Sequence, residues 1–527
     1  AQVNDLSHII NLDGDFPSFA YNGSWYSDGA IHITSPADAI KCDLQLTKLL
    51  DNGHHLKLNL QADASDNNLT TALKWDNHHP EERMNGELNT IIRLYQNLVN
   101  KPEAHVRIMP SHVLLNNSKW SVEPSDILYS ENHLLVDRFA VHHGDQHIII
   151  DGIASKRAED SITVDLNDVE VDYILDLVNF HSVEFSGKAT GRAYASSLFD
   201  KFAASADLDV SDFKFERGRM GVLHAHAKWN QELEQIDIQA VADDGPDAYT
   251  DVNGYVSPVH NTIDLAIDAH GTYIDFMHNF TNSFLSHVTG HAEGNTRLSG
   301  TLDNINLTGQ VVVDGEATVT SLNTTYQLRR DTVVMIPDEI ELHRLPIYDR
   351  NDHMAYLSGG IHHQHLTNLT FDLSVEAEDL LAFDFPDFGE SSFYGTVYAT
   401  GTVDIHGRPN EVTINCDVTP ESNSVFVYNA ANPDAISHQE FIEWEEEENK
   451  STGNKSTVNT RMTDTDIYIN FLINTTPQAT IRLLMDANTK DYITLNGEGA
   501  IRATFHNKGP FNMFGTYTVD HGTYGIT

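Results

Sequence analysis

Closely spaced histidines are the side chains of this sequence with the clearest capacity for chemistry. His224 and His226, and the group His362, His363 and His365, could chelate a transition metal, because residues two apart in a strand point to the same side. The alternate positions around the first pair are apolar (Leu223, Ala225, Ala227 and Trp229). We therefore interpret both histidines, and by the same argument the second group, as side chains on a solvated face.

Two acidic stretches could bind calcium through carboxylate oxygens, Asp349 to His353 (DRNDH) and Asp243 to Asp251 (DDGPDAYTD). Neither follows the EF-hand spacing or a glycine-rich calcium-roll repeat. The sequence also contains no GxSxG, GxxxxGK or HExxH motif, and its carboxylates are spread over turns. We predict no catalytic residue, no metal site and no cofactor, so that an enzyme is the least supported class.

Charge and cysteine content narrow the possible partners. The 527 residues include 32 Lys plus Arg against 77 Asp plus Glu, a formal net charge of −45, which repels nucleic acid. We interpret this charge as a solvated outer face. Cys42 and Cys416 stand alone, without CxxC or Cys/His spacing, so they indicate neither a disulfide framework nor zinc. No apolar run approaches the roughly 18 residues of a membrane-spanning helix, and we expect a soluble fragment of a longer protein.

A repeated strand organises the chain. In Ser391 to Gly407 (SSFYGTVYATGTVDIHG), small or apolar residues alternate with polar ones from Gly401 onwards, which is typical of a strand with one apolar face. The same phrase recurs at Gly191, Gly294 and Gly499, so the four glycines are 103, 107 and 98 residues apart. This spacing predicts a repeating unit of about a hundred residues.

Other segments give more local predictions. Asn52-Gly53 predicts a hairpin turn, and the apolar spacing predicts short helices over residues 171–178 and 274–288. Residues 87–100 carry a helical stripe between strand-like neighbours and stay unassigned. Ser437 to Thr457 is acidic and then rich in Ser, Asn and Lys, which favours an exposed, mobile loop.

These patterns together predict an all-β fold. Strands with one apolar face need a cover, and the sequence has too few helices to provide one. A long antiparallel sheet can instead curl into an open, taco-like or U-shaped form, with a few short helices, so that its apolar face lines a hydrophobic groove. Side chains could fill that groove, as in a solenoid or sandwich, or an apolar guest could occupy it. The small residues in the apolar phase favour an open interior.

Domain boundaries follow the repeat. We expect N-terminal strands of the same sheet in 1–105, β repeats in 106–185, 186–285 and 286–390, and a distinct C-terminal region in 391–527, with the acidic loop at 437–457.

The phrase SSFYGTVYATGTVDIHG and the closing stretch from Ile481 to Ile526 (IRLLMDANTKDYITLNGEGAIRATFHNKGPFNMFGTYTVDHGTYGI) resemble the C-terminal region of the TamB family. This family is the inner-membrane component of the translocation and assembly module of diderm bacteria and is related to AsmA-like proteins. The resemblance is most specific over 391–527 and extends more weakly back to about residue 105.

The resemblance implies a periplasmic protein, anchored in the inner membrane by an N-terminal helix outside this sequence. It implies a conduit that moves phospholipid between inner and outer membranes, and an outer-membrane β-barrel partner of the TamA type. The alternatives are a scaffold for β-barrel or autotransporter assembly and an extracellular β-rich adhesin. The groove candidates are the apolar-phase residues of the C-terminal region: Val403, Ile405, Val412, Ile414, Val418, Ile481, Leu483, Ile501, Ala503, Phe505, Tyr517 and Val519.

Overall fold

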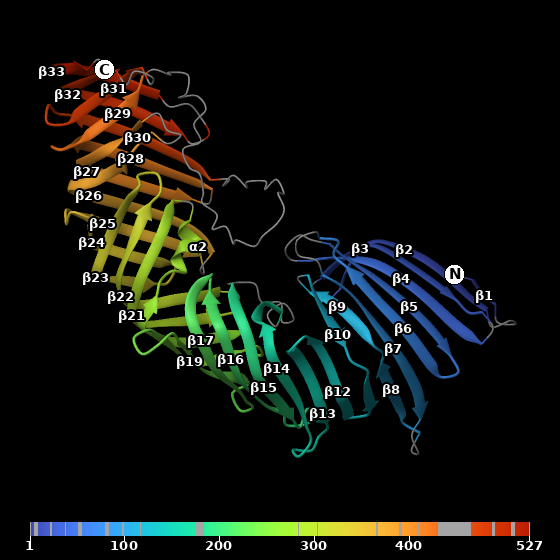
Figure 1. Ribbon diagram of the computed structural model, residues 1–527. Helices are drawn as coiled ribbons and strands as arrows, with labels where there is room; N and C mark the ends of the chain where they lie inside the picture. Colours follow the sequence, from blue (N-terminus) through green and yellow to red (C-terminus); the bar gives the residue numbers. More distant parts are fainter. Residues whose placement is uncertain are drawn as a thin grey trace. The chain divides into compact units, whose positions relative to one another are not determined.

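A computed structural model shows that the described residues are mostly β-strand, and α2 (Met277–Thr281) is a short helix that is described in full (Figure 1). The 33 strands belong to one sheet, which confirms the all-β fold. The structure describes residues 2–4, 9–21, 24–36, 38–50, 55–79, 84–96, 100–115, 117–173, 184–282, 284–302, 304–364, 367–388, 393–408, 410–430, 465–486, 491–506, 508 and 512–525.

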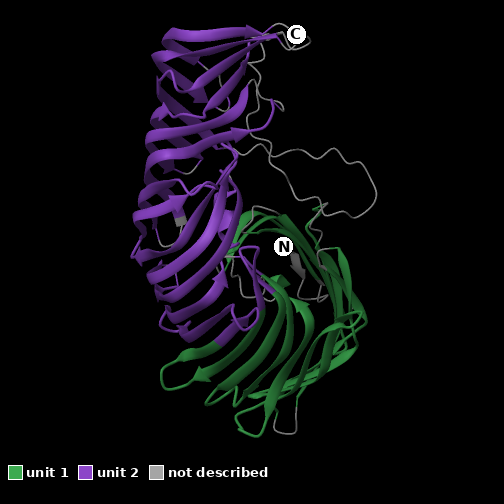
Figure 2. Cartoon of the chain, turned by 60° about the vertical axis from the view of Figure 1, so that its left-hand side comes forward, with its two compact units in different colours: residues 1–182, 186–212, 222–239 green, residues 183–185, 213–221, 240–527 purple. Residues whose placement is uncertain are grey.

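The chain divides into two compact units (Figure 2). Unit 1 comprises 1–182, 186–212 and 222–239, and unit 2 comprises 183–185, 213–221 and 240–527, so that β15 to β18 have residues in both. The strands that begin in the first half of the chain are β1 (Gln2–Asn4), β2 (Ile9–Tyr21), β3 (Ser24–Thr34), β4 (Ala39–Leu49), β5 (His55–Ser65), β6 (Asn68–Asp76), β7 (Asn85–Gln96), β8 (Pro102–Ile108), β9 (Ser111–Leu115), β10 (Ser118–Val122), β11 (Ser125–Ser130), β12 (His133–His143), β13 (Gln146–Ala154), β14 (Ser161–Glu170), β15 (Phe185–Ser196), β16 (Ala203–Phe215), β17 (Gly218–Asn230) and β18 (Gln235–Asp243).

The later strands all lie in unit 2. They are β19 (Tyr249–Ser257), β20 (Thr262–Tyr273), β21 (Leu285–Thr301), β22 (Asn304–Val319), β23 (Thr324–Ile336), β24 (Glu339–Tyr348), β25 (Met354–Gln364), β26 (Thr367–Phe385), β27 (Phe393–Arg408), β28 (Glu411–Pro420), β29 (Val425–Asn429), β30 (Asp466–Thr475), β31 (Thr480–Asp486), β32 (Asp491–His506) and β33 (Asn512–Gly525).

Three of the four repeated glycines, Gly191, Gly294 and Gly401, lie beside a β-bulge. Gly191 pairs with Leu166 and Gly401 with Ala377, and in both cases the register of the neighbouring strand shifts immediately afterwards. The bulge residues Asp168 (φ 56°) and Asp379 (φ 49°) are left-handed. Bulges bend a strand and increase its twist, so the glycine repeat marks where the sheet curves.

Two of the four repeats share the dipeptide Thr-Gly, at Thr190-Gly191 and Thr400-Gly401, and the structure gives a reason for both residues. The N–H of the bulge residue Asp379 donates to Thr400 Oγ1 at 2.9 Å, and that of Asp168 donates to Thr190 Oγ1 at 3.0 Å. A Cβ on Gly401 (φ 151°) would lie 2.1 Å from the carbonyl oxygen of Asp417 on β28. The threonine hydroxyl therefore accepts the backbone N–H of the bulge residue, while the glycine that follows it lets the next strand approach closely.

The sheet is mixed, which corrects the prediction of a purely antiparallel one. β27 pairs along its second half with β28 and along its first with β29, and β32 pairs in the same way with β30 and β31. Between them β28 pairs with β30, and β29 with β31, in parallel. Parallel neighbours need a crossover connection instead of a tight turn. Residues 431–464, which follow β29 and precede β30 in the sequence, lie outside the described residues, and the predicted acidic loop falls within them.

Local predictions had mixed outcomes. Residues 85–96 form β7, a strand, so the helical stripe in 87–100 was misleading. Leu49 pairs with His55 as the predicted hairpin requires, although its turn lies outside the described residues. Of the helix predicted over 171–178, residues 171–173 are helical and the remainder is not described.

The helix predicted over 274–288 was too long. Only Met277–Thr281 is helical, and β21 begins at Leu285. The apolar spacing at Phe276 and Phe284 reflects contacts with the sheet, because each ring packs against a phenylalanine of a strand. It does not reflect one face of a continuous helix.

Candidate functional site

An apolar face runs across unit 2 from β24 to β33, built by the register of its strands. Val403 of β27 lies opposite Val375 of β26 and Cys416 of β28, and the same row continues through Phe471, Ala503 and Met513. The neighbouring row consists of Leu373, Ile405, Ile414, Ile469 and Phe505. Because side chains alternate strictly between the faces of a sheet, paired residues share a face. We call this surface the apolar face.

All twelve residues predicted for the groove fall on the apolar face. Val412 and Val418 lie on β28 in phase with Ile414, and Ile501 pairs with Ile473 next to Ala503. The remaining four join through β29, β31 and β33: Ile481 pairs with Phe426, Leu483 with Tyr428, Tyr517 with Gly499 and Val519 with Gly497. The structure therefore brings the predicted set together on one surface, although no ligand marks that surface as a lipid path.

Most of this face is only partly covered. Val412 and Ala503 are buried, Val519 is 46% exposed, and the other nine are intermediate. Alternate residues of β27, such as Thr402, Asp404 and His406, are exposed on the opposite, polar face. The apolar face thus retains room for further apolar contacts, whereas the polar face is solvated.

Unit 2 curves enough for strands that are not neighbours to touch. Tyr326 of β23 donates its hydroxyl to the carbonyl of Leu381 on β26 at 2.8 Å, although β24 and β25 lie between them in the sheet. The turn before β23 also contacts β26, because Asn323 Nδ2 donates to the carbonyl of Asp384 at 2.7 Å. Burial raises the pKa of Tyr326 to about 12. The sheet is therefore closed at this end of β23 to β26.

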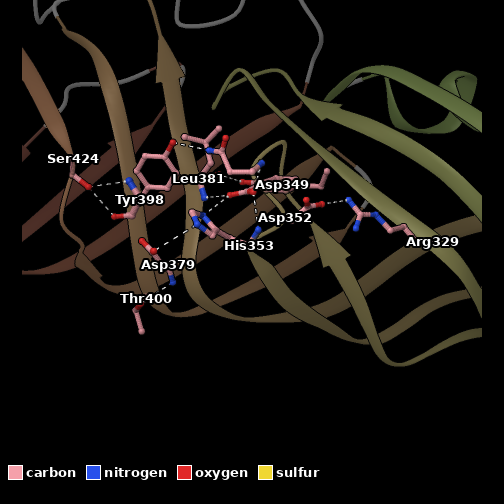
Figure 3. A network of polar contacts seen from close by, with 11 residues as sticks. Arg329, Asp349, Asp352, His353, Asp379, Leu381, Tyr398, Thr400 and Ser424 are labelled. Atoms are coloured by element: carbon pink, nitrogen blue, oxygen red, sulfur yellow. Dashed lines mark hydrogen bonds and ion pairs between the residues drawn. The ribbon is translucent and has the colours of Figure 1, made fainter.

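A buried aspartate fastens this closure (Figure 3). The side chain of Asp349 is 0% exposed, and its carboxylate accepts backbone N–H groups from Asn351 at 2.8 Å, His353 at 3.0 Å and Leu381 at 2.8 Å. His353 Nδ1 lies 3.2 Å from the same carboxylate, and Asn351 Nδ2 donates to the Tyr398 hydroxyl at 2.7 Å. Both carboxylate oxygens of Asp349 thus accept hydrogen bonds, which hold the loop between β24 and β25 against β26. These bonds account for the aspartate of the DRNDH stretch without a calcium ion.

The other acidic stretch is also used internally. Asp243 accepts the N–H of Gly245 at 2.8 Å, and Asp244 pairs with Arg219. No group of three or more His, Cys, Asp or Glu side chains within the described ranges is arranged to hold a metal ion.

The histidines divide between the two faces. His224 and His226 are exposed and pair with Asp209 and Asp207, each at 2.6 Å, as their solvated phase predicts. His362 is partly exposed and lies 3.6 Å from Glu339. The prediction was wrong for His363, whose side chain is 1% exposed, because adjacent residues of a strand point to opposite faces. His365 lies outside the described residues.

Both cysteines are free thiols. Cys416 lies on the apolar face opposite Val403, and burial raises the pKa of its thiol to about 12. A thiol with so high a pKa is an apolar wall residue and not a nucleophile.

Arginine and carboxylate pairs stabilise the polar face. Arg297 Nε lies 2.7 Å from Asp264, and this hydrogen bond holds the pKa of the Asp264 carboxyl below its ordinary value. Arg192 lowers the pKa of Asp165 in the same way, with a smaller contribution from His147. Each of these two pairs joins neighbouring strands, β20 to β21 and β14 to β15.

A hollow of about 620 Å³ in unit 1 has a mixed lining, with Asn59, Lys74, Asp76, Glu87 and His112 beside Leu46, Leu58 and Trp75. Its charged residues distinguish it from the apolar face of unit 2.

Several apolar-face residues were absent from the prediction. Phe371, Leu373 and Val375 alternate with polar residues in β26, so the period of two could have found them. Ile467, Ile469 and Phe471 could be placed only once the parallel pairing of β30 with β28 was known.

Comparisons with known proteins give one match. Residues 343–526 match the family model described as the TamB C-terminal domain. Neither the curated proteins nor the solved structures contain a match to the chain. Among the described residues, no helix has the length and hydrophobicity needed to cross a membrane. Residues 343–526 include every predicted groove residue and the strands that assemble them. Residues 343–526 are therefore similar to the C-terminal domain of the TamB family.

Proposed function

We propose that the apolar face carries the acyl chains of phospholipid between the inner and outer membranes and so contributes to outer-membrane biogenesis. The observation that carries this proposal is the register of β26 to β32, which aligns apolar residues in rows across successive strands. The match of residues 343–526 to the C-terminal domain of the TamB family, a transport and assembly family, supports it. No step of bond chemistry is part of the proposal.

The energetics favour a conduit. Exposing two acyl chains of about 16 carbons to water, at about 0.8 kcal/mol per CH₂, opposes free movement of a phospholipid by on the order of 20 kcal/mol. Apolar side chains such as those of Val403, Ile405 and Ile414 would replace water around the acyl chains. Because these residues are only partly covered by protein, acyl chains would bury them further.

The polar headgroup would remain in water while its chains lie along the apolar face. In the full-length protein we propose periplasmic placement with an inner-membrane anchor and an outer-membrane β-barrel of the TamA type as the receiving partner. The family resemblance supports these placements.

Photo-crosslinking tests the proposal. A phospholipid with a photoreactive acyl chain is incorporated into the purified protein, illuminated, and its adducts are mapped by peptide mass spectrometry. We expect adducts on apolar-face residues such as Ile405, Ile414 and Phe505, and few on Thr402 or Asp404, which lie on the same strand as Ile405 but on the polar face. Equal labelling of the two faces, or a protein that takes up no phospholipid, contradicts the proposal.

A second candidate function is a scaffold that templates β-barrel strands. The observation in its favour is β33, which pairs with β32 and, among the described residues, with no other strand. It exposes large apolar groups, including Phe514 at 66%. An edge with unpaired backbone groups can accept an added strand. Crosslinks from β33 to an unfolded barrel protein, together with absence of lipid adducts on the apolar face, would favour this function instead.

A further inference from the structure

The connection between β20 and β21 crosses the apolar side of unit 2. The ring centroid of Phe284, just before β21, lies 5.8 Å from that of Phe371 on β26. Strands β22, β23, β24 and β25 separate those two strands in the sheet. In a flat sheet five strand steps would amount to about 24 Å. The connection and the curved sheet therefore meet across the apolar side.

The near end of this connection is firmly attached. The ring of Phe276 lies 5.3 Å from that of Phe215 at the end of β16. Asn279 Nδ2 donates to the buried carboxylate of Glu216 at 2.6 Å. A Cβ on Gly218 would lie 2.3 Å from the backbone nitrogen of Phe276, so glycine lets the connection lie directly on the start of β17.

The middle of the connection is held more lightly than its two ends. Helix α2 contains no buried residue, and Phe280 is 43% exposed. Beyond it, the carbonyl of Phe284 accepts the N–H of Thr320 at 3.1 Å, and the ring of Phe284 forms a tilted pair with that of Phe371. Phe371 is itself fixed, because its ring covers Gly407, where a Cβ would lie 2.1 Å from Phe371 Cζ. The connection is thus fastened at Glu216 and at the start of β21, and the ring of Phe284 rests on Phe371.

We propose that this connection, residues 274–282 together with Phe284, is a strap across the acyl path, and that the contact of the Phe284 ring with Phe371 sets the clearance beneath it. The strap then determines how bulky a lipid can pass unit 2: a one-chain lipid passes beneath it, whereas a two-chain phospholipid requires the contact to open. This inference rests on the proposed function, because the strap has a role in specificity only if acyl chains use the apolar face.

Transfer between vesicles tests the strap. The Phe284→Ala variant removes one ring of the pair, and we expect it to accelerate transfer of a fluorescent two-chain phospholipid about two- to tenfold, the factor for the loss of one aromatic pair. Transfer of a fluorescent lysophospholipid should stay unchanged. Phe280→Ala is the matched control, since it removes an exposed ring from the same connection, and both of its rates should equal those of the unchanged protein.

A crosslink supplies the opposite perturbation. Phe284→Cys and Phe371→Cys, in a background with Cys42→Ser and Cys416→Ser, are joined by a short cleavable thiol reagent. Joining should slow two-chain transfer and spare one-chain transfer, and cleavage should restore the rate. If Phe284→Ala and the crosslink leave the ratio of the two rates unchanged while the unmodified protein transfers lipid, the strap is overturned. A protein that transfers neither lipid overturns the proposed function itself.

Discussion

A charge placed on the apolar face provides the sharpest test of lipid passage. Val403 lies in the middle of a row between Val375 and Cys416, and Val403→Arg would put a guanidinium against passing acyl chains. Desolvating an unpaired charge costs several kcal/mol, and the long arginine side chain can recover part of this by reaching towards water. A net cost of about 2 to 3 kcal/mol lowers the transfer rate roughly 30- to 150-fold.

The matched control lies one residue away. Thr402 is exposed on the polar face opposite Glu376 and Asp417, so Thr402→Arg adds the same charge among carboxylates and should leave transfer unchanged. Val403→Leu, an apolar change on the apolar face, should also be silent. Transfer of fluorescent phospholipid between vesicles measures all three, with thermal melting to verify folding. If Val403→Arg transfers lipid as fast as Thr402→Arg in folded protein, acyl chains do not use this face.

Four further outcomes follow from the structure. Gly401→Ala should lower the free energy of unfolding by about 2 to 4 kcal/mol in denaturant titrations, because it adds a backbone clash to an unfavourable φ; Gly245→Ala (φ 114°, open space) should cost only about 1 kcal/mol, and equal losses would contradict the close-approach argument. Asp349→Ala should leave three backbone N–H groups, of which that of Leu381 is buried, without their acceptor and increase hydrogen exchange at Leu381, while Asp352→Ala serves as an exposed control from the same loop. The depressed pKa of Asp264 means that its pairing with Arg297 stabilises the fold above the ordinary carboxyl pKa of 3.8 and is lost as pH falls through the lower folded value; Asp264→Asn should therefore flatten stability against pH below about pH 4, and an unchanged acid limb would count against the pair. Chelators should not change the melting temperature, whereas a loss restored by calcium or zinc would point to a bound metal.

The sequence was most informative where one strand alone carries the pattern. Alternation in β27 placed Val403 and Ile405 on one face, whereas the glycine spacing predicted a repeat and not the bulges beside Gly191 and Gly401. The reason for those glycines, a carbonyl oxygen of the next strand that would lie 2.1 Å from an added Cβ, involves atoms distant in sequence and could not be read from spacing.

Features that depend on long-range geometry could not be predicted. Successive strands usually form antiparallel hairpins, so the sequences of β28 and β30 did not indicate that these two strands pair in parallel. The four-residue spacing of Phe276, Phe280 and Phe284 imitated a helix, because contacts with other phenylalanines, and not helical packing, place two of the rings. The residue types around Asp349 do not distinguish this stretch from a calcium-binding loop. Only the structure shows that its carboxylate accepts three backbone N–H groups.

The crossover in unit 2 has a consequence for the order of folding. Across the antiparallel pair of β27 and β28, Ile405 meets Ile414 after a separation of nine residues, whereas across the parallel pair Ile414 meets Ile469 after 55. Closing a longer loop costs more entropy, and contacts distant in sequence form more slowly. Strands up to β28 can therefore assemble in sequence order as the chain emerges, while β30 to β33 must wait for the crossover to close. The C-terminal end of the sheet is completed last, and lengthening or shortening residues 431–464 should change the rate of that final step more than the stability of the finished sheet.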